Sequence, residues 1–390
     1  MIFQFNFKSL FVVLFIIISQ PLLAQESKPV AIIPFEFRND RIIIKLKIND
    51  SNKVLNMLFD TGADGVGMKK EVADAIGLKE TRKQQASVVG GTSTIVISSG
   101  NTLCFDTLKI KNQNIGIFPN YNDELDGLFG ANFLRNFITY IDFDHSVINL
   151  YRFGKINYPD GGTKIPLDYA TGLPGIQAKA KLNNGKEILA NLHFDTGAGY
   201  PLIFFGPSVK NNELEKDFKV QFKSSTFSFS HETATLNGII DFLEVGTYKV
   251  PHFTGTLQGW VEGMPDFGKL NDGSLGIKII SKFNCFINVP AKEFYMIPNK
   301  SFNNPIDFWL NKNEFGFVDD QLIIKHPSVS SPYDQNTPHL NDAVLSINGI
   351  RSDDFKDLNI IKKLEEESEI KPLVLEIARN GPPMTITVSN

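Results

Sequence analysis

The sequence has few cysteines and no cluster of positive charge. Its 390 residues include 2 Cys, Cys104 and Cys285, each in a hydrophobic, strand-like segment of a different half of the chain. We therefore expect two buried small side chains rather than a disulfide bond. The formal net charge is −4 and no run of Lys or Arg occurs, which argues against a nucleic acid as partner.

The histidines have no metal-ligand spacing. Five of them are scattered singly along the chain, at His145, His231, His252, His326 and His339. The sequence therefore predicts neither a metal site nor another cofactor. His193 lies two residues before Asp195, but the matching position of the first half holds Leu58. This favours a hydrogen-bonded core histidine over a catalytic one.

Apolar runs long enough to span a membrane are also missing near the N-terminus. The run from Leu10 to Ile18 has nine residues, whereas a spanning helix needs about 20. Lys8 precedes the run and Pro21-Leu22-Leu23-Ala24 follows it, which is typical of a signal peptide cleaved after Ala24. We expect residues 1–24 to be removed, leaving an exported protein, periplasmic or secreted, without a membrane span. An uncleaved N-terminal anchor is the alternative.

Against these absences, one five-residue motif, FDTGA, occurs twice. The copies are Phe59–Ala63 and Phe194–Ala198, 135 positions apart, and each follows a strand-like run and enters a glycine turn. A single copy would be ordinary turn chemistry. The exact repeat instead places Asp60 and Asp195 at equivalent points of two similar halves, and two carboxylates that meet across a pseudo-twofold axis can act as a catalytic pair.

A second landmark repeats after the first. Asp126-Gly127-Leu128-Phe129-Gly130 in the first half corresponds to Asp272-Gly273-Ser274-Leu275-Gly276 in the second. Apolar residues make up 42% of the chain, which indicates a globular protein. Two similar copies of about 130 residues indicate duplication and fusion. We expect domains at residues 25–155, 156–300 and 310–390.

These motifs resemble the lobes of retropepsin-like and pepsin-like aspartic proteases over residues 30–300. The resemblance implies that Asp60 and Asp195 are catalytic, that the residues after each aspartate support the pair, and that a flap closes over substrate. The supporting loop residues are Thr61, Gly62, Ala63, Thr196, Gly197 and Ala198, and the flap residues are Gly90 and Gly91. Ser274 departs from the apolar residue that the family carries at this position.

The chemistry of such a pair follows from its charge. Two close carboxylates share one proton; the ionised one accepts a proton from water and the protonated one donates to the scissile carbonyl. Ala63 and Ala198 stand where a hydroxyl could favour ionisation, so we expect raised pKa values and a mildly acidic to neutral optimum. Two alternatives stay open: each DTG is only a structural turn, and Gly90-Gly91 is an ordinary hairpin turn.

The last ninety residues resemble a PDZ domain. Phe315, Gly316 and Phe317 match its carboxylate-binding loop, and Ser331-Pro332 and Ile347-Asn348-Gly349 match later turns, although Asn341 replaces the usual glycine. The resemblance implies that an extended peptide adds as a strand beside a helix. The sequence predicts that helix over Asp353 to Glu367, and a hairpin turn at Asn380-Gly381. A lid with an occluded groove is the alternative.

The whole sequence therefore predicts a mainly β protein with two retropepsin-like β-barrel lobes and a PDZ-like α+β domain. We expect an aspartic endopeptidase that acts on peptides or proteins, as a monomer with an intramolecular pseudo-dimer. A non-catalytic peptide-binding or scaffolding protein with the same fold is the alternative from another class. A further possibility is that the halves do not face each other.

Overall fold

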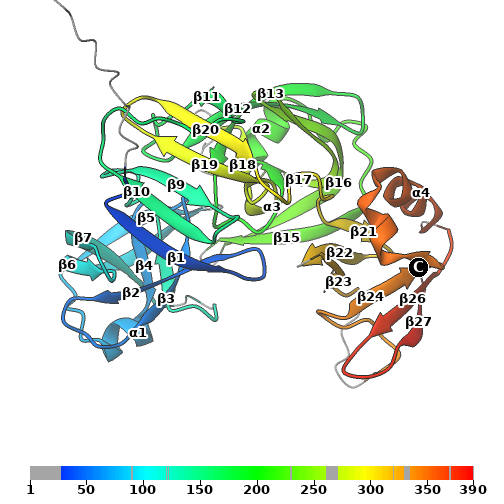
Figure 1. The fold of residues 1–390 in the computed structure, drawn as a ribbon, viewed down its shortest axis with the longest axis horizontal. Coiled ribbons are helices and arrows are strands. Elements are labelled where there is room, and N and C mark those ends of the chain that lie inside the picture. The colour runs from blue at the N-terminus through cyan, green and yellow to red at the C-terminus, as the bar shows by residue number, and fades with distance from the viewer. Residues whose placement is uncertain are drawn as a thin grey trace, which may run out of the picture.

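The computed structural model describes residues 28–88, 91–119, 121, 123–228, 231–260, 271–318, 320–328, 334–368 and 370–389. Over these residues the chain is mainly β, as predicted, and forms three sheets. Figure 1 shows the first half (residues 31–151) in blue to cyan, the second half (residues 163–298) in green to yellow, and the C-terminal module (residues 308–388) in orange to red. The expected signal peptide, residues 1–24, lies outside the described residues.

Alternation of apolar and polar residues explains the strands of the first half. In β1, for example, Ala31, Ile33 and Phe35 point into the core and their neighbours point outward. The helix of this half is α1 (Lys70–Ala75). The strands are β1 (Ala31–Phe37), β2 (Ile42–Ile48), β3 (Leu55–Phe59), β4 (Val66–Lys69), β5 (Arg82–Val88), β6 (Gly91–Cys104), β7 (Lys109–Phe118), β8 (Gly127–Phe129), β9 (Ile138–Asp142) and β10 (Val147–Tyr151).

The second half repeats this order of elements. Its helices are α2 (Gly206–Asn211) and α3 (Ile277–Ile280). Its strands are β11 (Thr163–Pro166), β12 (Gly175–Leu182), β13 (Glu187–Phe194), β14 (Leu202–Phe204), β15 (Phe222–Ser228), β16 (His231–Val245), β17 (Tyr248–Gln258), β18 (Gly273–Leu275), β19 (Phe283–Asn288) and β20 (Glu293–Pro298). The pairing of β12 with β16 closes six strands into a barrel, and β2 pairs with β6 in the same way in the first half.

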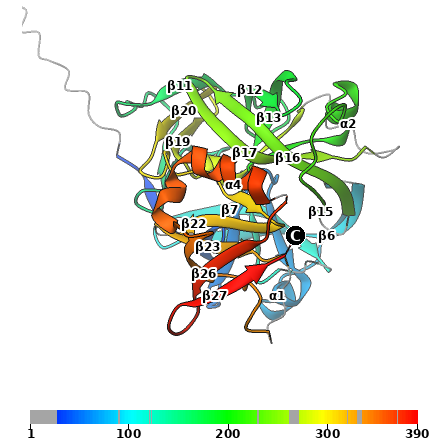
Figure 2. The same cartoon turned by 90° about the vertical axis from the view of Figure 1, so that its right-hand side faces the viewer.

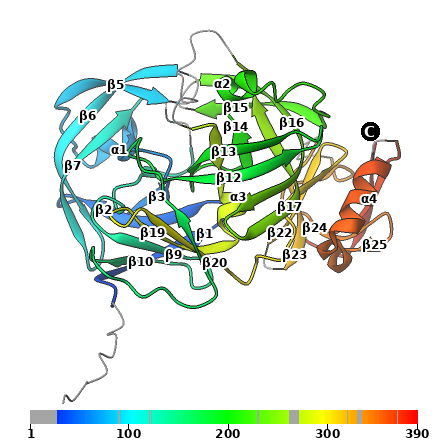
Figure 3. The ribbon, with the colours of Figure 1, turned by 90° about the horizontal axis from the view of Figure 1, so that it is seen from above.

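Six strands join the halves side by side, in the order β11-β20-β19-β9-β10-β1. At their centre β9 pairs antiparallel with β19, with Tyr140 opposite Phe286; the two rings stack with centroids 4.0 Å apart. In Figure 3 these strands run along one edge of the molecule, below both barrels. One continuous hydrophobic core fills both halves, so their relative position is fixed by packing.

The C-terminal module has its own hydrophobic core. Figure 2 looks onto α4 (Leu358–Ser368) and the strands of its sheet. Its predicted helix is split: Ser352–Lys356 is a 3-10 helix, and Asp357 is extended before α4 begins. The strands are β21 (Phe308–Leu310), β22 (Asn313–Val318), β23 (Gln321–His326), β24 (Ala343–Ile347), β25 (Ile350–Arg351), β26 (Leu373–Ala378) and β27 (Met384–Val388).

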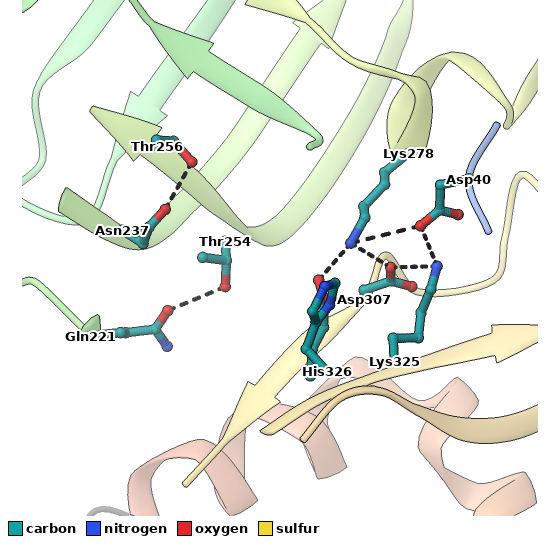
Figure 4. A network of polar contacts seen from close by, with 10 residues as sticks. Asp40, Gln221, Asn237, Thr254, Thr256, Lys278, Asp307, Lys325 and His326 are labelled. Atoms are coloured by element: carbon teal, nitrogen blue, oxygen red, sulfur yellow. Dashed lines mark hydrogen bonds and ion pairs between the residues drawn. The ribbon is translucent and has the colours of Figure 1, made fainter. Parts of the chain in front are cut away.

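A buried cluster of charges fixes the module to both halves. Lys278 of α3 lies 2.8 Å from Asp307 and 2.5 Å from Glu314. Lys325 of β23 lies 2.9 Å from Asp307 and also pairs with Asp40 of the first half. Figure 4 shows these side chains converging from three parts of the chain. We call Asp40, Lys278, Asp307, Glu314 and Lys325 the charge cluster.

The two cysteines are not bonded to each other. Cys285 is buried in β19, where burial raises the pKa of its thiol. Cys104, at the end of β6, is only partly buried. The expected burial is therefore confirmed for Cys285, whereas Cys104 is less buried than expected.

Candidate active site

The two aspartates follow equivalent strands. Asp60 comes directly after β3, and its backbone N–H donates to the carbonyl of Phe129 in the parallel strand β8 (2.9 Å). Asp195 comes directly after β13 and donates to the carbonyl of Leu275 in β18 (3.0 Å). In each half, a carbonyl group of the second landmark thus accepts the backbone N–H of the aspartate and fixes its position.

Each loop passes directly against the carboxyl group of the other. A Cβ atom added to Gly62 would lie 2.4 Å from Cγ of Asp195, and one added to Gly197 would lie 2.3 Å from Cγ of Asp60. Any side chain at these positions would overlap a carboxyl group, so glycine is needed for the approach. The structure therefore brings Asp60 and Asp195 together in one chain, and the halves face each other.

The threonines interlock the two loops. Thr61 Oγ1 donates to the carbonyl of Phe194 (2.5 Å) and accepts from the backbone N–H of Thr196 (3.1 Å). In return, Thr196 Oγ1 donates to the carbonyl of Phe59 (2.8 Å) and accepts from the N–H of Thr61 (3.0 Å). Both side chains are fully buried, so they have no contact with solvent. The four hydrogen bonds therefore fix the position of one loop against the other.

The carboxyl groups share a buried, hydrogen-bonded environment. Burial and the neighbouring Asp195 carboxylate raise the pKa of Asp60 well above its ordinary value. Burial also raises the pKa of Asp195, but donors around it oppose the shift. The N–H group of Gly62 donates to Asp60 and that of Gly197 donates to Asp195, so each carboxyl group accepts a hydrogen bond from its own loop (2.9 Å in both). Two coupled carboxyls in this setting retain one proton between them.

The backs of the two loops are tightly packed. The N–H of Ala131 donates to the carbonyl of Ala63 (2.9 Å), and the N–H of Ile277 donates to the carbonyl of Ala198 (2.9 Å). A Cβ atom at Gly130 would lie 2.3 Å from the carbonyl oxygen of Ala63. The glycine that ends each second landmark therefore allows the chain to pass behind the loop that carries the aspartate.

The predicted flap is a hairpin of β5 and β6, which pair from Arg82 and Ile97 up to Val88 and Gly91. Gly91 begins β6, and Gly90 lies outside the described residues. The second half has an equivalent hairpin of β15 and β16, which pair up to Ser228 and His231. The sequence did not predict this hairpin, because Phe222–Ser228 has no regular alternation of apolar and polar residues and no glycine pair follows it.

His193 has the structural environment expected of it. Its Nε2 lies 2.9 Å from the side-chain nitrogen of Asn271, and burial lowers the pKa of its ring to about 4. The ring packs beside Phe205 at 6.2 Å between centroids. Among the described residues, no group of three His, Cys, Asp or Glu side chains could hold a metal ion.

The expected carboxylate-binding loop is wrong: Phe315, Gly316 and Phe317 lie within strand β22. A two-residue turn, with Asn311 and Lys312 both at positive φ, connects β21 to β22 as a hairpin. β21 therefore pairs with the edge of β22 at Phe315 and also contacts α4. The peptide-binding role assigned to these residues stays a prediction, and Ser331-Pro332 lies outside the described residues.

Comparison with known families agrees with the geometry of the first half. Residues 44–133 match the model of a family described as Aspartyl protease. The matched stretch contains Asp60, Gly91 and the Leu128-Phe129-Gly130 landmark, and it ends before the second FDTGA motif. A comparison with curated proteins found no match.

Proposed function

We propose that the protein is an aspartic endopeptidase in which Asp60 and Asp195 activate one water molecule. The observation that carries the proposal is the reciprocal approach of the two loops, which places each glycine against the opposite carboxyl group. One carboxylate accepts a proton from the water as its oxygen bonds to the peptide carbonyl carbon. The other carboxyl group donates its proton to the carbonyl oxygen.

The described strands beside the site have free edges to which an extended peptide could bind. β5 is the last strand of the first sheet and β15 is the last strand of the second. An edge strand has unpaired backbone N–H and C=O groups, which an extended peptide can satisfy. The aspartyl protease match of residues 44–133 suggests peptidase activity independently. We therefore propose a peptide or protein substrate bound in an extended conformation.

Export is a further proposal, and it is based on residues 1–24 alone, with their short apolar run and Ala24. Among the described residues, no helix is both long and apolar enough to cross a membrane. A peptide-recognition role for the C-terminal module also stays a proposal; β21 pairs with β22 only over Asn313 to Phe315.

The proposed chemistry is tested with Asp60→Asn and Asp195→Asn. An amide keeps the shape of the side chain but cannot exchange the proton, so each variant should lose about 10³-fold or more in kcat/KM on a quenched-fluorescence peptide library. The double variant should be no worse than either single one, since the pair acts as a unit. Asp241→Asn is the matched control, because Asp241 is exposed on β16.

Circular dichroism and urea unfolding should show that all variants remain folded. Substantial cleavage by either single variant would contradict the two-carboxyl mechanism. Absence of cleavage by the wild type at every pH between about 4 and 8 would favour the alternative of a peptide-binding protein that keeps the fold.

A further inference from the structure

The two halves of the site differ at one position beside the carboxyl groups. Ser274 of β18 lies opposite His193, and its counterpart Leu128 of β8 lies opposite Leu58. The Ser274 hydroxyl donates to Oδ2 of Asp195 (3.3 Å). Leu128 has no hydroxyl and packs instead against apolar neighbours. Asp195 therefore receives a side-chain donor that Asp60 does not receive from the equivalent position.

Tyr200 adds to this difference between the surroundings of Asp195 and Asp60. The Tyr200 side chain lies against Ser274, and the two hydroxyls interact. Tyr200 follows the second catalytic loop, and its backbone carbonyl packs against Gly276 at the end of the second landmark. Ser274 is 1% exposed, so no solvent competes for its hydroxyl. Burial keeps Tyr200 protonated, and a phenol that donates to the Ser274 oxygen leaves the serine proton for Asp195.

We propose that Ser274 is a positioning residue that holds Asp195 as the ionised member of the pair, so that Asp195 is the base and Asp60 is the acid. This inference rests on the proposed endopeptidase function and assigns the two roles within it. A donor at a carboxylate favours the charged form, and the pair has one donor more on the side of Asp195. The pKa values agree in direction, because that of Asp60 is raised further.

The assignment fixes the path of each proton. Asp195 takes a proton from water as the water oxygen bonds to the carbonyl carbon, while the carbonyl oxygen takes the proton of Asp60. When the carbon–nitrogen bond breaks, the leaving nitrogen takes the proton now on Asp195. One hydroxyl of the intermediate returns its proton to Asp60 as the new carboxyl group forms. The pair ends in its starting protonation state.

The other titratable side chains near the pair add no charge that would reverse the order in which Asp195 and Asp60 ionise. Burial raises the pKa of both Tyr121, on the side of Asp60, and Tyr200, on the side of Asp195. His193 precedes Asp195 on β13, and burial lowers its pKa to about 4. All three side chains are therefore neutral above about pH 5. Behind Tyr121, Arg41 and Asp123 form an ion pair with each other (3.0 Å).

The test is the pH dependence of kcat/KM for Ser274→Ala. Removing the donor should raise the lower of the two pKa values of the pair, and so move the acidic limb of the profile upward by about one pH unit. At a pH on that limb the activity should fall about tenfold. Ser274→Thr keeps a hydroxyl and should restore the wild-type profile. Tyr200→Phe, which leaves Ser274 in place, should shift the limb in the same direction by less.

Ser208→Ala is the matched control, because Ser208 is a buried serine of the same half whose hydroxyl donates to another carboxylate, Asp272 (3.0 Å). It should leave the acidic limb unchanged. An unmoved limb in Ser274→Ala, or an equal shift in Ser208→Ala, would overturn the assignment while leaving the endopeptidase proposal intact.

Carboxyl ¹³C chemical shifts measure the same titration without turnover. The resonances of the pair are assigned by their loss in Asp60→Asn and in Asp195→Asn, and Asp195 should ionise first in the wild type. Ionisation of Asp60 first would overturn the inference even in an active enzyme. An inactive wild type with the expected order of ionisation would overturn the endopeptidase proposal and leave the role of Ser274 in the pair supported.

Discussion

At the scale of single residues, the Thr61 hydroxyl makes two hydrogen bonds between the halves. Its Oγ1 atom both donates to the other half and accepts from it, in a fully buried position. From the family resemblance, the sequence predicted that Thr61 supports the pair, but not which atoms it bonds. It did not predict that Ser274 would touch Asp195, because the motif shows only that a serine replaces an apolar residue there.

We expect Thr61→Val to separate shape from hydrogen bonding. Valine keeps the volume but leaves the carbonyl of Phe194 and the N–H of Thr196 without their partner, at a cost of about 1–3 kcal/mol for each buried group. Urea unfolding should show this loss, and kcat/KM should fall because the loops are no longer held together. Thr61→Ser keeps the hydroxyl and should stay close to the wild type. Wild-type activity in Thr61→Val would show that the interlock is not needed for catalysis.

At the scale of elements, alternation predicted most strands, whereas turns were predicted less well. The expected Asn380-Gly381 hairpin exists, but β26 ends at Ala378 and β27 begins at Met384, so five residues rather than two connect the strands. Pro382 and Pro383 follow the glycine and cannot donate hydrogen bonds to a ladder. Similarly, the flap hairpin of the second half needed no glycine pair, so local composition did not reveal it.

β21 illustrates an element that sequence patterns could not place. It has three residues, and its neighbour α4 lies about fifty positions later in the chain. Phe308 is buried and stacks on Phe315 (5.7 Å between centroids) and on Phe355 (5.8 Å). The resemblance to a peptide-binding domain predicted that a peptide adds as a strand beside a helix; β21 lies beside α4 and pairs with β22 over Asn313 to Phe315.

Phe308→Ala should therefore destabilise the C-terminal module locally. Loss of a buried phenylalanine costs about 3–5 kcal/mol, and hydrogen exchange should accelerate in β21, β22 and α4 but not in β12 or β13. Leu189→Ala is the control on β13, because Leu189 is 61% exposed and its loss should change stability by less than about 0.5 kcal/mol. Equal acceleration throughout the second half would show that the module has no separate stability.

At the scale of the whole molecule, the charge cluster joins parts of the chain that are far apart in sequence. Lys278 lies two residues after Gly276, which packs behind the second catalytic loop, and its partners Asp307 and Glu314 lie at the start of the module. No local pattern predicts such pairing, so the sequence analysis treated the module as independent. A chain that ends near Ser301 would leave Lys278 buried without these two partners.

Within the charge cluster, Asp307 and Glu314 give the fold a pH dependence of one sign, and Asp40, whose pKa is raised by burial and by Asp307, contributes the opposite sign. Although burial opposes it, Lys278 holds the pKa values of Asp307 and Glu314 below their ordinary range. The unfolded chain then binds more protons than the folded one in acid. Stability from these two groups is complete above about pH 4.5, the ordinary carboxyl pKa, and is lost as the pH falls toward their folded values.

Lys278→Met should lower the unfolding free energy at pH 7 by about 3 kcal/mol, because it leaves buried carboxylates without their main partner. It should also flatten the decline of stability below about pH 4.5, since the two pKa values return toward their ordinary range. Urea unfolding across this pH range measures both effects. Lys179→Met, which removes an exposed pair with Glu187 (2.7 Å), should change little. An identical acid profile in Lys278→Met would contradict the assigned role of the cluster.

The contact between Trp309 of β21 and Phe222 of β15 has an optical consequence. The chain has 2 Trp, Trp260 and Trp309, and the indole of Trp309 in β21 lies 4.4 Å from the ring of Phe222, the first residue of β15. The imidazole of His326 stacks near the same indole, with ring centroids 6.2 Å apart. With Trp260→Phe the remaining indole emits from the junction between the module and the hairpin of β15 and β16. Movement of that hairpin relative to β21 then changes the fluorescence of the unlabelled protein.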